Sequence, residues 1–172
     1  VFYNYWVDND PHLHISQIFT NLLRRLRINS AYNYFYFPES QEDNRKINKY
    51  LTELGIDKFI CIHPGSSKNF EGKRWNAQNF AELSNMLIRK YDFPLIFIGT
   101  REENRIIDDI FRHIEIKDRL FNLASLLTIW ESVELIRRSY LFVSNDTGPV
   151  HIAASLGIGT VVLYGPTSPI RY

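Results

Sequence analysis

The part of this chain from residue 58 onward alternates short apolar runs with amphipathic segments, and this alternation constrains the fold most. In the segment 77–90, Phe80, Leu83, Leu87 and Ile88 recur at the spacing of one helical face. The short runs have the length of strands, and strands that are apolar throughout are typical of a parallel sheet buried on both faces. We therefore predict an α/β fold with a three-layer, Rossmann-like parallel sheet. The predicted strands are 59–62, 95–98, 120–123, 141–144 and 160–164, and the predicted helices are 77–90, 102–114, 129–138 and 150–156.

The first 57 residues form a second part with a different pattern. Apolar residues recur at helical spacing over 14–26, which predicts a helix there. The aromatic run 33–37 favours a short strand. A polar helix is expected from Pro38 to Leu54, with Gly55 as its carboxyl-terminal cap. We therefore divide the chain into residues 1–57 and residues 58–172.

Four of the predicted strands end in small, polar or glycine-containing turns. These turns are 65–67, 99–100, 146–148 and 165–167. Parallel sheets bind ligands at the carboxyl ends of their strands, so the four turns predict one site on one edge. The segment 144–151 is the most informative, because a helix opens at Gly148 and the positive end of its dipole attracts an anion such as phosphate. Asp146, Thr147 and His151 crowd into this segment, which indicates a binding site and not merely a connection.

The turn after the first predicted strand carries groups suited to phosphate. Ser66 and Ser67 supply two hydroxyl donors, Gly65 allows close backbone approach, and Lys73 supplies positive charge. A Walker loop is excluded, because six residues separate the first glycine from the Gly-Lys pair and Arg74 replaces the required Ser or Thr. An ordinary turn with solvated lysines is the alternative.

Acidic residues follow the predicted strand that ends at Gly99. In nucleotide-binding folds, an acidic residue such as Glu102 or Glu103 at this point accepts hydrogen bonds from both hydroxyls of a ribose. The alternative is a pair of acids in the first turn of a helix, where they complement its dipole. His151 also has an alternative, a buried histidine whose ring is satisfied within the protein.

Several other kinds of chemistry are disfavoured. The triplet 146–148 matches the active-site letters of aspartic proteases, but a helix directly after the turn argues against their mostly β fold. The five histidines are dispersed and Cys61 is the only cysteine, so neither a metal site nor an intrachain disulfide is expected. A net charge of +1 gives no field for nucleic acid. A lone thiol fits a reducing compartment, and we expect a cytoplasmic protein.

The strand-end turns, taken in order, resemble those of the ADP-heptose:lipopolysaccharide heptosyltransferases of bacteria, glycosyltransferase family 9. The matching segments are 62–67, 73–75, 97–100, 143–154 and 163–169. The specific parts are the run from Asp146 to His151 and the late Gly-Pro-Thr turn at 165–167. The resemblance implies the carboxyl-terminal half of a GT-B glycosyltransferase. Residues 58–172 would be its nucleotide-sugar-binding domain, truncated at its end, and residues 1–57 the end of the acceptor-binding lobe and the interlobe region.

The resemblance also implies a role for each matching residue. Ser66, Ser67 and Lys73 would hold the diphosphate, Glu103 (or else Glu102) the ribose, Asp146 the hydroxyls of the sugar, and Thr147 and Gly148 the phosphates, with His151 supporting their turn. These groups would stabilise the leaving diphosphate with no metal or other cofactor. The catalytic residues are unknown, because the family's general base is an aspartate near the start of the amino-terminal lobe and no segment here matches that region.

The implied function is inverting transfer of a heptose or related sugar from a nucleotide-sugar, ADP-heptose, to a lipopolysaccharide core. The implied partners are the nucleotide-sugar donor and a lipid A–core acceptor, with no nucleic acid, and with peripheral contact at the cytoplasmic face of the inner membrane. Two alternatives stay open. One is another GT-B enzyme that uses a UDP-sugar, as a transferase or an epimerase. The other is a non-catalytic nucleotide-sugar-binding module.

Overall fold

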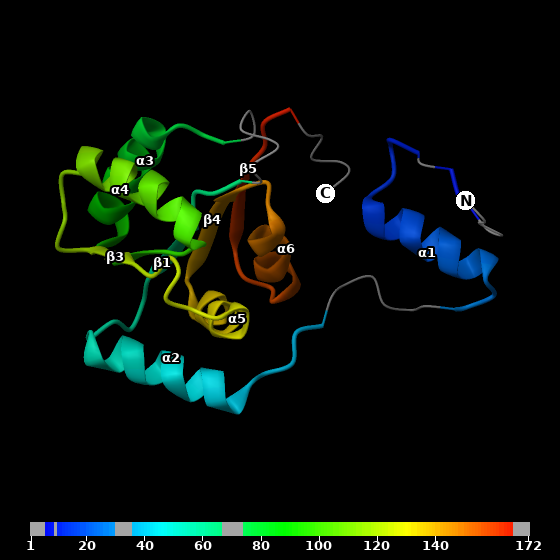
Figure 1. The fold of residues 1–172 in the computed structure, drawn as a ribbon, viewed down its shortest axis with the longest axis horizontal. Coiled ribbons are helices and arrows are strands. Elements are labelled where there is room, and N and C mark those ends of the chain that lie inside the picture. Colours follow the sequence, from blue (N-terminus) through cyan, green and yellow to red (C-terminus); the bar gives the residue numbers. More distant parts are fainter. Residues whose placement is uncertain (1–5, 9, 30–35, 67–73, 167–172) are drawn as a thin grey trace.

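The fold is centred on one parallel sheet, as the alternating pattern predicts. A computed structural model describes residues 6–8, 10–29, 36–66 and 74–166. Within them, five strands pair in the order β3-β2-β1-β4-β5, and every pair is parallel (Figure 1). The strands are β1 (Ile60–His63), β2 (Leu95–Phe97), β3 (Leu120–Asn122), β4 (Leu141–Asn145) and β5 (Thr160–Leu163). The predicted α/β class and parallel sheet are confirmed.

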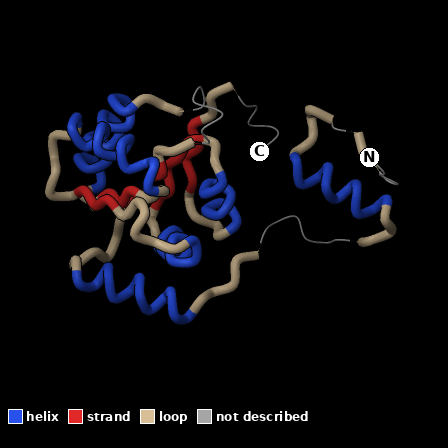
Figure 2. Tube along the Cα trace, in the orientation of Figure 1, coloured by secondary structure: helices blue, strands red, loops and turns tan. Residues whose placement is uncertain are grey.

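Helices cover both faces of the sheet. Successive strand residues point to opposite sides, and apolar residues on both sides have to be buried. Ile60 and Ile62 of β1 pack in one core cluster with Phe80 and Ile110, whereas Cys61 packs in another with Ile136. The first cluster lies under α3 (Ala77–Tyr91) and α4 (Asn104–His113). The second lies under α2 (Gln41–Glu53), α5 (Ile129–Arg138) and α6 (Gly148–Ser155). The sheet is therefore the middle of three layers (Figure 2).

The helix boundaries follow from local capping. The Asn76 side chain accepts a hydrogen bond of 2.7 Å from the Asn79 amide and begins α3. Gly55 has φ +66° directly after α2, and its amide bonds the Thr52 carbonyl, which confirms the predicted glycine cap. The predicted helix at 102–114 instead begins with the 3₁₀ turn η2 (Arg101–Glu103), and only then continues as α4.

The first part of the chain contains the two predicted helices. The helix α1 (Ile15–Arg25) matches the prediction for 14–26, and it lies apart from the helices that flank the sheet (Figure 1). The predicted strand at 33–37 is not found where it is described, because Tyr36 and Phe37 have no regular structure; residues 33–35 lie outside the described residues. Over the described ranges, no helix is both long and apolar enough to cross a bilayer.

A buried carboxylate joins α2 to α5. The Glu134 side chain is only 1% exposed, and its oxygens accept hydrogen bonds from the Ser40 amide at 3.3 Å and from Arg138 at 3.2 Å. Arg137 lies 3.4 Å from the same carboxylate and donates a bond to the Phe37 carbonyl. These polar contacts lie beside the packing of α2 on α5 and fix the chain before α2 to α5.

Candidate functional site

The carboxyl ends of β1, β2, β4 and β5 lie side by side, so the predicted turns meet at one edge. The pairing places His63 opposite Ser144, Ile62 opposite Phe97 and Asn145 opposite Leu163. This register brings the turns after the four strands close together. The described part of the edge comprises Ser66, Gly99, Thr100, Glu103, Asp146, Thr147, Gly148, His151 and Gly165. Ser67, Lys73 and Thr167 lie outside the described residues.

Glu103 is the charged centre of this edge. Its Oε2 atom accepts hydrogen bonds from the Thr100 amide at 2.6 Å and the Thr100 hydroxyl at 3.0 Å, while Oε1 lies 3.4 Å from His63 Nε2. Burial on its own would raise the pKa of Glu103, but the hydrogen bonds and charge of His63 and the bonds from Thr100 lower this pKa to about 2. The side chain is 12% exposed, so a charged acceptor sits at the edge of the sheet. Glu102, the alternative residue, is exposed.

Two glycines make room for this carboxylate. A Cβ atom on Gly65 would overlap Oε1 of Glu103, and one on Gly99 would lie 2.8 Å from Oε2. The close approach expected for Gly65 is thus an approach to Glu103. Glu103 also forms a capping box with Thr100 at the start of the 3₁₀ turn. The alternative interpretation of Glu103, as an acid in the first turn of a helix, therefore also matches a contact in the structure.

His63 connects Glu103 to the turn after β4. Its Nδ1 atom lies 3.2 Å from the Ser144 hydroxyl and 3.3 Å from the Thr147 hydroxyl. The residue is buried, with 7% of its surface exposed. Sequence reasoning treated His63 only as the start of a motif and missed this role. Its position directly after the predicted strand 59–62 was the available signal.

Asn145 holds the chain on both sides of the undescribed segment 67–73. Its Nδ2 donates to the carbonyls of Pro64 at 2.8 Å and Gly65 at 3.1 Å, and its Oδ1 accepts from the Trp75 amide at 3.1 Å. Asn145 is fully buried. Nearby, the Arg74 guanidinium donates to the Ser66 hydroxyl at 3.3 Å. The sequence did not single out Asn145 or Arg74 as site residues.

The turn after β4 leads directly into α6. Thr147 is the N-cap residue, α6 begins at Gly148, and a proline in its first turn needs no amide partner. Among the described residues, no atom lies within 4 Å of a Cβ atom built on Gly148, so they leave the space beside the start of this helix open. Asp146 is buried beside Tyr164, whose pKa is raised by burial and by the Asp146 charge. Half-buried His151 lies in the first helical turn.

Taken together, the edge offers two kinds of binding group. The negative charge of Glu103 accepts hydrogen bonds from hydroxyls, and the amino-terminal end of α6 favours an anion. His63 lies between them. In the described part of the chain, no three His, Cys, Asp or Glu side chains are grouped to hold a metal ion.

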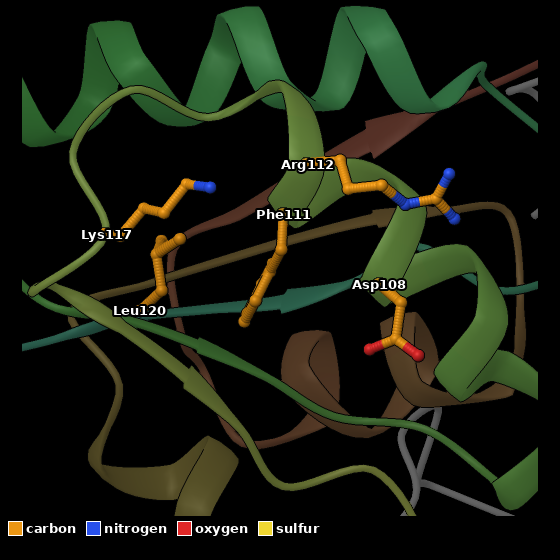
Figure 3. A pocket seen from close by; sticks show the side chains of 5 residues that line it. All are labelled: Asp108, Phe111, Arg112, Lys117 and Leu120. Atoms are coloured by element: carbon orange, nitrogen blue, oxygen red, sulfur yellow. The ribbon is translucent and has the colours of Figure 1, made fainter.

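A separate cavity lies away from this edge. It has a volume of about 320 Å³ and is lined by Asp108, Phe111, Arg112, Lys117 and Leu120 (Figure 3). Figure 3 shows Phe111 and Arg112 on the same helix, with Lys117 on the segment before β3 and Leu120 at the start of β3. None of these residues is a predicted site residue, so this cavity is distinct from the predicted site.

Comparison with known proteins gives concordant matches. The family model described as glycosyltransferase family 9 (heptosyltransferase) matches residues 1–172. The lipooligosaccharide heptosyltransferase 2 of Haemophilus influenzae is 31% identical over 133 residues, which cover 76% of this chain and 38% of that protein. The chain therefore spans well under half the length of this curated relative.

Solved structures support the fold. A family 9 glycosyl transferase from Veillonella parvula has a TM-score of 0.86 at 23% identity, covering 98% of this chain and 48% of its own. The E. coli ADP-heptose LPS heptosyltransferase II has a TM-score of 0.78 at 22% identity, covering 96% of this chain and 53% of its own. The chain thus has part of the GT-B fold of these proteins.

Proposed function

Since this chain belongs to glycosyltransferase family 9, the heptosyltransferase family, we propose that it supplies the nucleotide-sugar-binding part of an inverting glycosyltransferase. The reaction transfers a heptose from ADP-heptose to a lipopolysaccharide core acceptor. The observation that carries this proposal is the meeting of charged Glu103 and the start of α6 at one sheet edge, on either side of His63. Residues 58–172 form the donor-binding domain, and residues 1–57 the end of the acceptor lobe and the interlobe region.

Glu103 binds the ribose of the donor. Its lowered pKa keeps the carboxylate charged at neutral pH, so it accepts hydrogen bonds and donates none. A carboxylate has about four acceptor positions, and in the described part of the chain three donors face Glu103, namely the Thr100 amide, the Thr100 hydroxyl and the His63 ring. About one acceptor position is therefore left for a ribose hydroxyl, and a ribose that displaces the Thr100 hydroxyl gains a second.

The start of α6 binds the diphosphate. Thr147 and Gly148 stand where the helix dipole favours negative charge, and the residues that the structure describes leave the space beside Gly148 open. Ser66, Ser67 and Lys73 complete the phosphate contacts, Asp146 contacts the hydroxyls of the heptose, and His151 supports the turn. Charge grows on the diphosphate as the bond to the sugar breaks, so donors fixed in advance lower the barrier.

The acceptor side of the reaction is assigned to residues outside this chain. The general base that deprotonates the acceptor hydroxyl is an aspartate of the amino-terminal lobe. Because the acceptor is a lipid-linked saccharide, the reaction takes place on the cytoplasmic face of the inner membrane, with peripheral contact between enzyme and bilayer.

Calorimetric titration with ADP and with UDP tests this proposal. ADP is expected to bind, and Lys73→Ala to weaken ADP binding about tenfold to a hundredfold, because a charge-assisted contact contributes roughly 1.5–3 kcal/mol. Lys49→Ala on α2 is the matched control, since Lys49 is exposed and pairs only with Glu53 at 3.8 Å in the described structure. Folded protein that binds no nucleotide would contradict the proposal. A preference for UDP would contradict ADP-heptose as donor but keep the GT-B class.

A further inference from the structure

The His63 imidazole touches groups from both halves of the proposed donor site. We propose that His63 is a positioning residue that fixes the Glu103 carboxylate and the Thr147 hydroxyl relative to each other, and so couples the ribose subsite to the diphosphate subsite. This inference rests on the proposed function and deepens it. Its basis is the geometry of one buried ring and its neighbours.

The hydrogen bonds around the ring define its role. The Ser144 hydroxyl has one hydrogen, which it donates to the Asn145 carbonyl at 2.9 Å. The Thr147 hydroxyl lies 3.3 Å from both His63 Nδ1 and the Asn145 carbonyl, so it contacts the ring and its own turn at once. On the other side of the ring, Nε2 lies 3.4 Å from Glu103 Oε1, and because a carboxylate only accepts, Nε2 carries the proton and donates it. One imidazole thus contacts the phosphate side through Nδ1 and donates to the ribose side through Nε2.

Because His63 is buried, losing one of these contacts would be costly. His63 is 7% exposed, so a ring nitrogen that lost its partner would have little water to replace it. The ring belongs to the last residue of β1, a central strand paired on both sides, and its backbone is therefore fixed. A Cβ atom on Gly65 would also lie 3.0 Å from Cε1 of His63, so the glycine beside Glu103 accommodates the ring as well.

Such a link reduces the cost of binding the donor. Glu103 follows β2 and Thr147 follows β4, and β1 separates these two strands in the sheet. Without a connection, each side chain would be ordered separately when the nucleotide binds. With His63 between them, both are held before binding, and the ligand meets a preorganised site.

The test compares ADP with 2′,3′-dideoxy-ADP, which lacks both ribose hydroxyls, by titration calorimetry. Wild-type protein is expected to bind ADP about tenfold more tightly, because a hydrogen bond to a charged group is lost in the analogue. His63→Phe keeps the ring size and removes both nitrogens, and it is expected to reduce this preference to about twofold or less. His63→Gln retains an amide that can reach Glu103 and is expected to restore part of the preference. His113→Phe, on the partly exposed end of α4, is the matched control.

A merely structural role for His63 would weaken both nucleotides equally and leave their ratio unchanged, and that result overturns the proposal. Equal affinity of wild-type protein for the two nucleotides overturns it too, while the proposed function stands because ADP still binds. If the folded protein binds neither nucleotide, the proposed function itself is contradicted, and the role of His63 with it. If His63→Phe does not fold, the ring nitrogens of wild-type protein decide by NMR. A ring that carries a proton on Nε2 and whose shifts move with ADP supports the proposal, and a ring without that proton or indifferent to ADP overturns it.

Discussion

Gly65 and Glu103 share one small volume at the end of β1: a Cβ atom on Gly65 would overlap Oε1 of the Glu103 carboxylate. The two residues are far apart in sequence, and the pairing of β1 with β2 brings them together. The glycine is needed here for space, since its φ is not in the left-handed region. The position of the Glu103 carboxylate therefore depends on the absence of a side chain at Gly65, in the turn after β1.

Gly65→Ala should displace the Glu103 side chain and leave the fold intact. The overlapping atom is the free end of a flexible side chain, so Glu103 is expected to swing away, giving up its contacts with His63 and Thr100. We expect a loss of roughly 1–3 kcal/mol in the free energy of unfolding and a loss of the preference for ADP over its dideoxy analogue. Urea unfolding and calorimetry measure the two effects.

Gly159→Ala is the control for that substitution. A Cβ atom there would meet Leu141 Cδ1 at 3.6 Å, an ordinary contact, so stability should change by less than about 0.5 kcal/mol. An unchanged nucleotide preference in Gly65→Ala would show that the position of Glu103 does not matter for binding.

The pKa of Glu103 predicts a pH-dependent contribution to stability. In the folded protein this pKa is lowered from 4.5 to about 2, so the folded state favours the charged form. The contribution is complete above pH 4.5 and disappears as the pH falls through 2. Glu103→Gln should therefore lower the free energy of unfolding by roughly 1–3 kcal/mol at pH 7, and by progressively less below pH 4.5.

Urea unfolding of wild-type and Glu103→Gln protein at pH 7, 4.5 and 3 measures this difference. Glu102→Gln is the matched neighbour, because Glu102 is exposed, and its effect should be within about 0.5 kcal/mol at each pH. A Glu103→Gln effect that stays constant from pH 7 to pH 3 would contradict the lowered pKa.

A negative charge at position 145 is expected to destabilise the protein. Asn145→Asp keeps the shape of the side chain and the acceptor for the Trp75 amide. It replaces the donor to the Pro64 and Gly65 carbonyls with an oxygen that repels both. In a fully buried position this should cost about 2–4 kcal/mol, measurable by thermal or urea unfolding. Asn48 on α2 also donates a side-chain bond, to Asn44 Oδ1 at 2.9 Å, but both side chains are accessible to water. Asn48→Asp keeps the oxygen that accepts from Arg138 and should be nearly neutral.

Much of the fold could be predicted because buried strands appear in the sequence as short, continuous apolar runs. A strand covered on both faces is apolar along its covered length, as in β1, where all four residues are buried and only the last, His63, is polar. The turns at the strand ends were predictable from the same pattern. The aromatic run at 33–37 was misleading at Tyr36 and Phe37, since a strand needs a partner as well as suitable residues.

The contacts within the site were harder to predict, because they join residues far apart in sequence. The bond between His63 and Glu103 requires the register of β1 on β2, and that of Asn145 with Pro64 requires β1 on β4. One local signal was available. Thr100 and Glu103 have the spacing of a capping box, which indicates that the Glu103 side chain turns back toward the strand end. It also selects Glu103 over Glu102 without reference to any family.

The buried Glu134 should control the attachment of α2 to α5. Glu134→Gln removes the charge that faces Arg137 and Arg138 and weakens the bond to the Ser40 amide. The two arginine side chains are 23% and 20% exposed and stay partly hydrated, so the loss should be roughly 1–3 kcal/mol. The loss should appear first as faster hydrogen exchange over 41–53, with the strands still protected. Glu53→Gln, at an exposed pair with Lys49, should leave this exchange unchanged. Uniformly faster exchange in α2 and the sheet would mean that α2 and the sheet unfold as one unit.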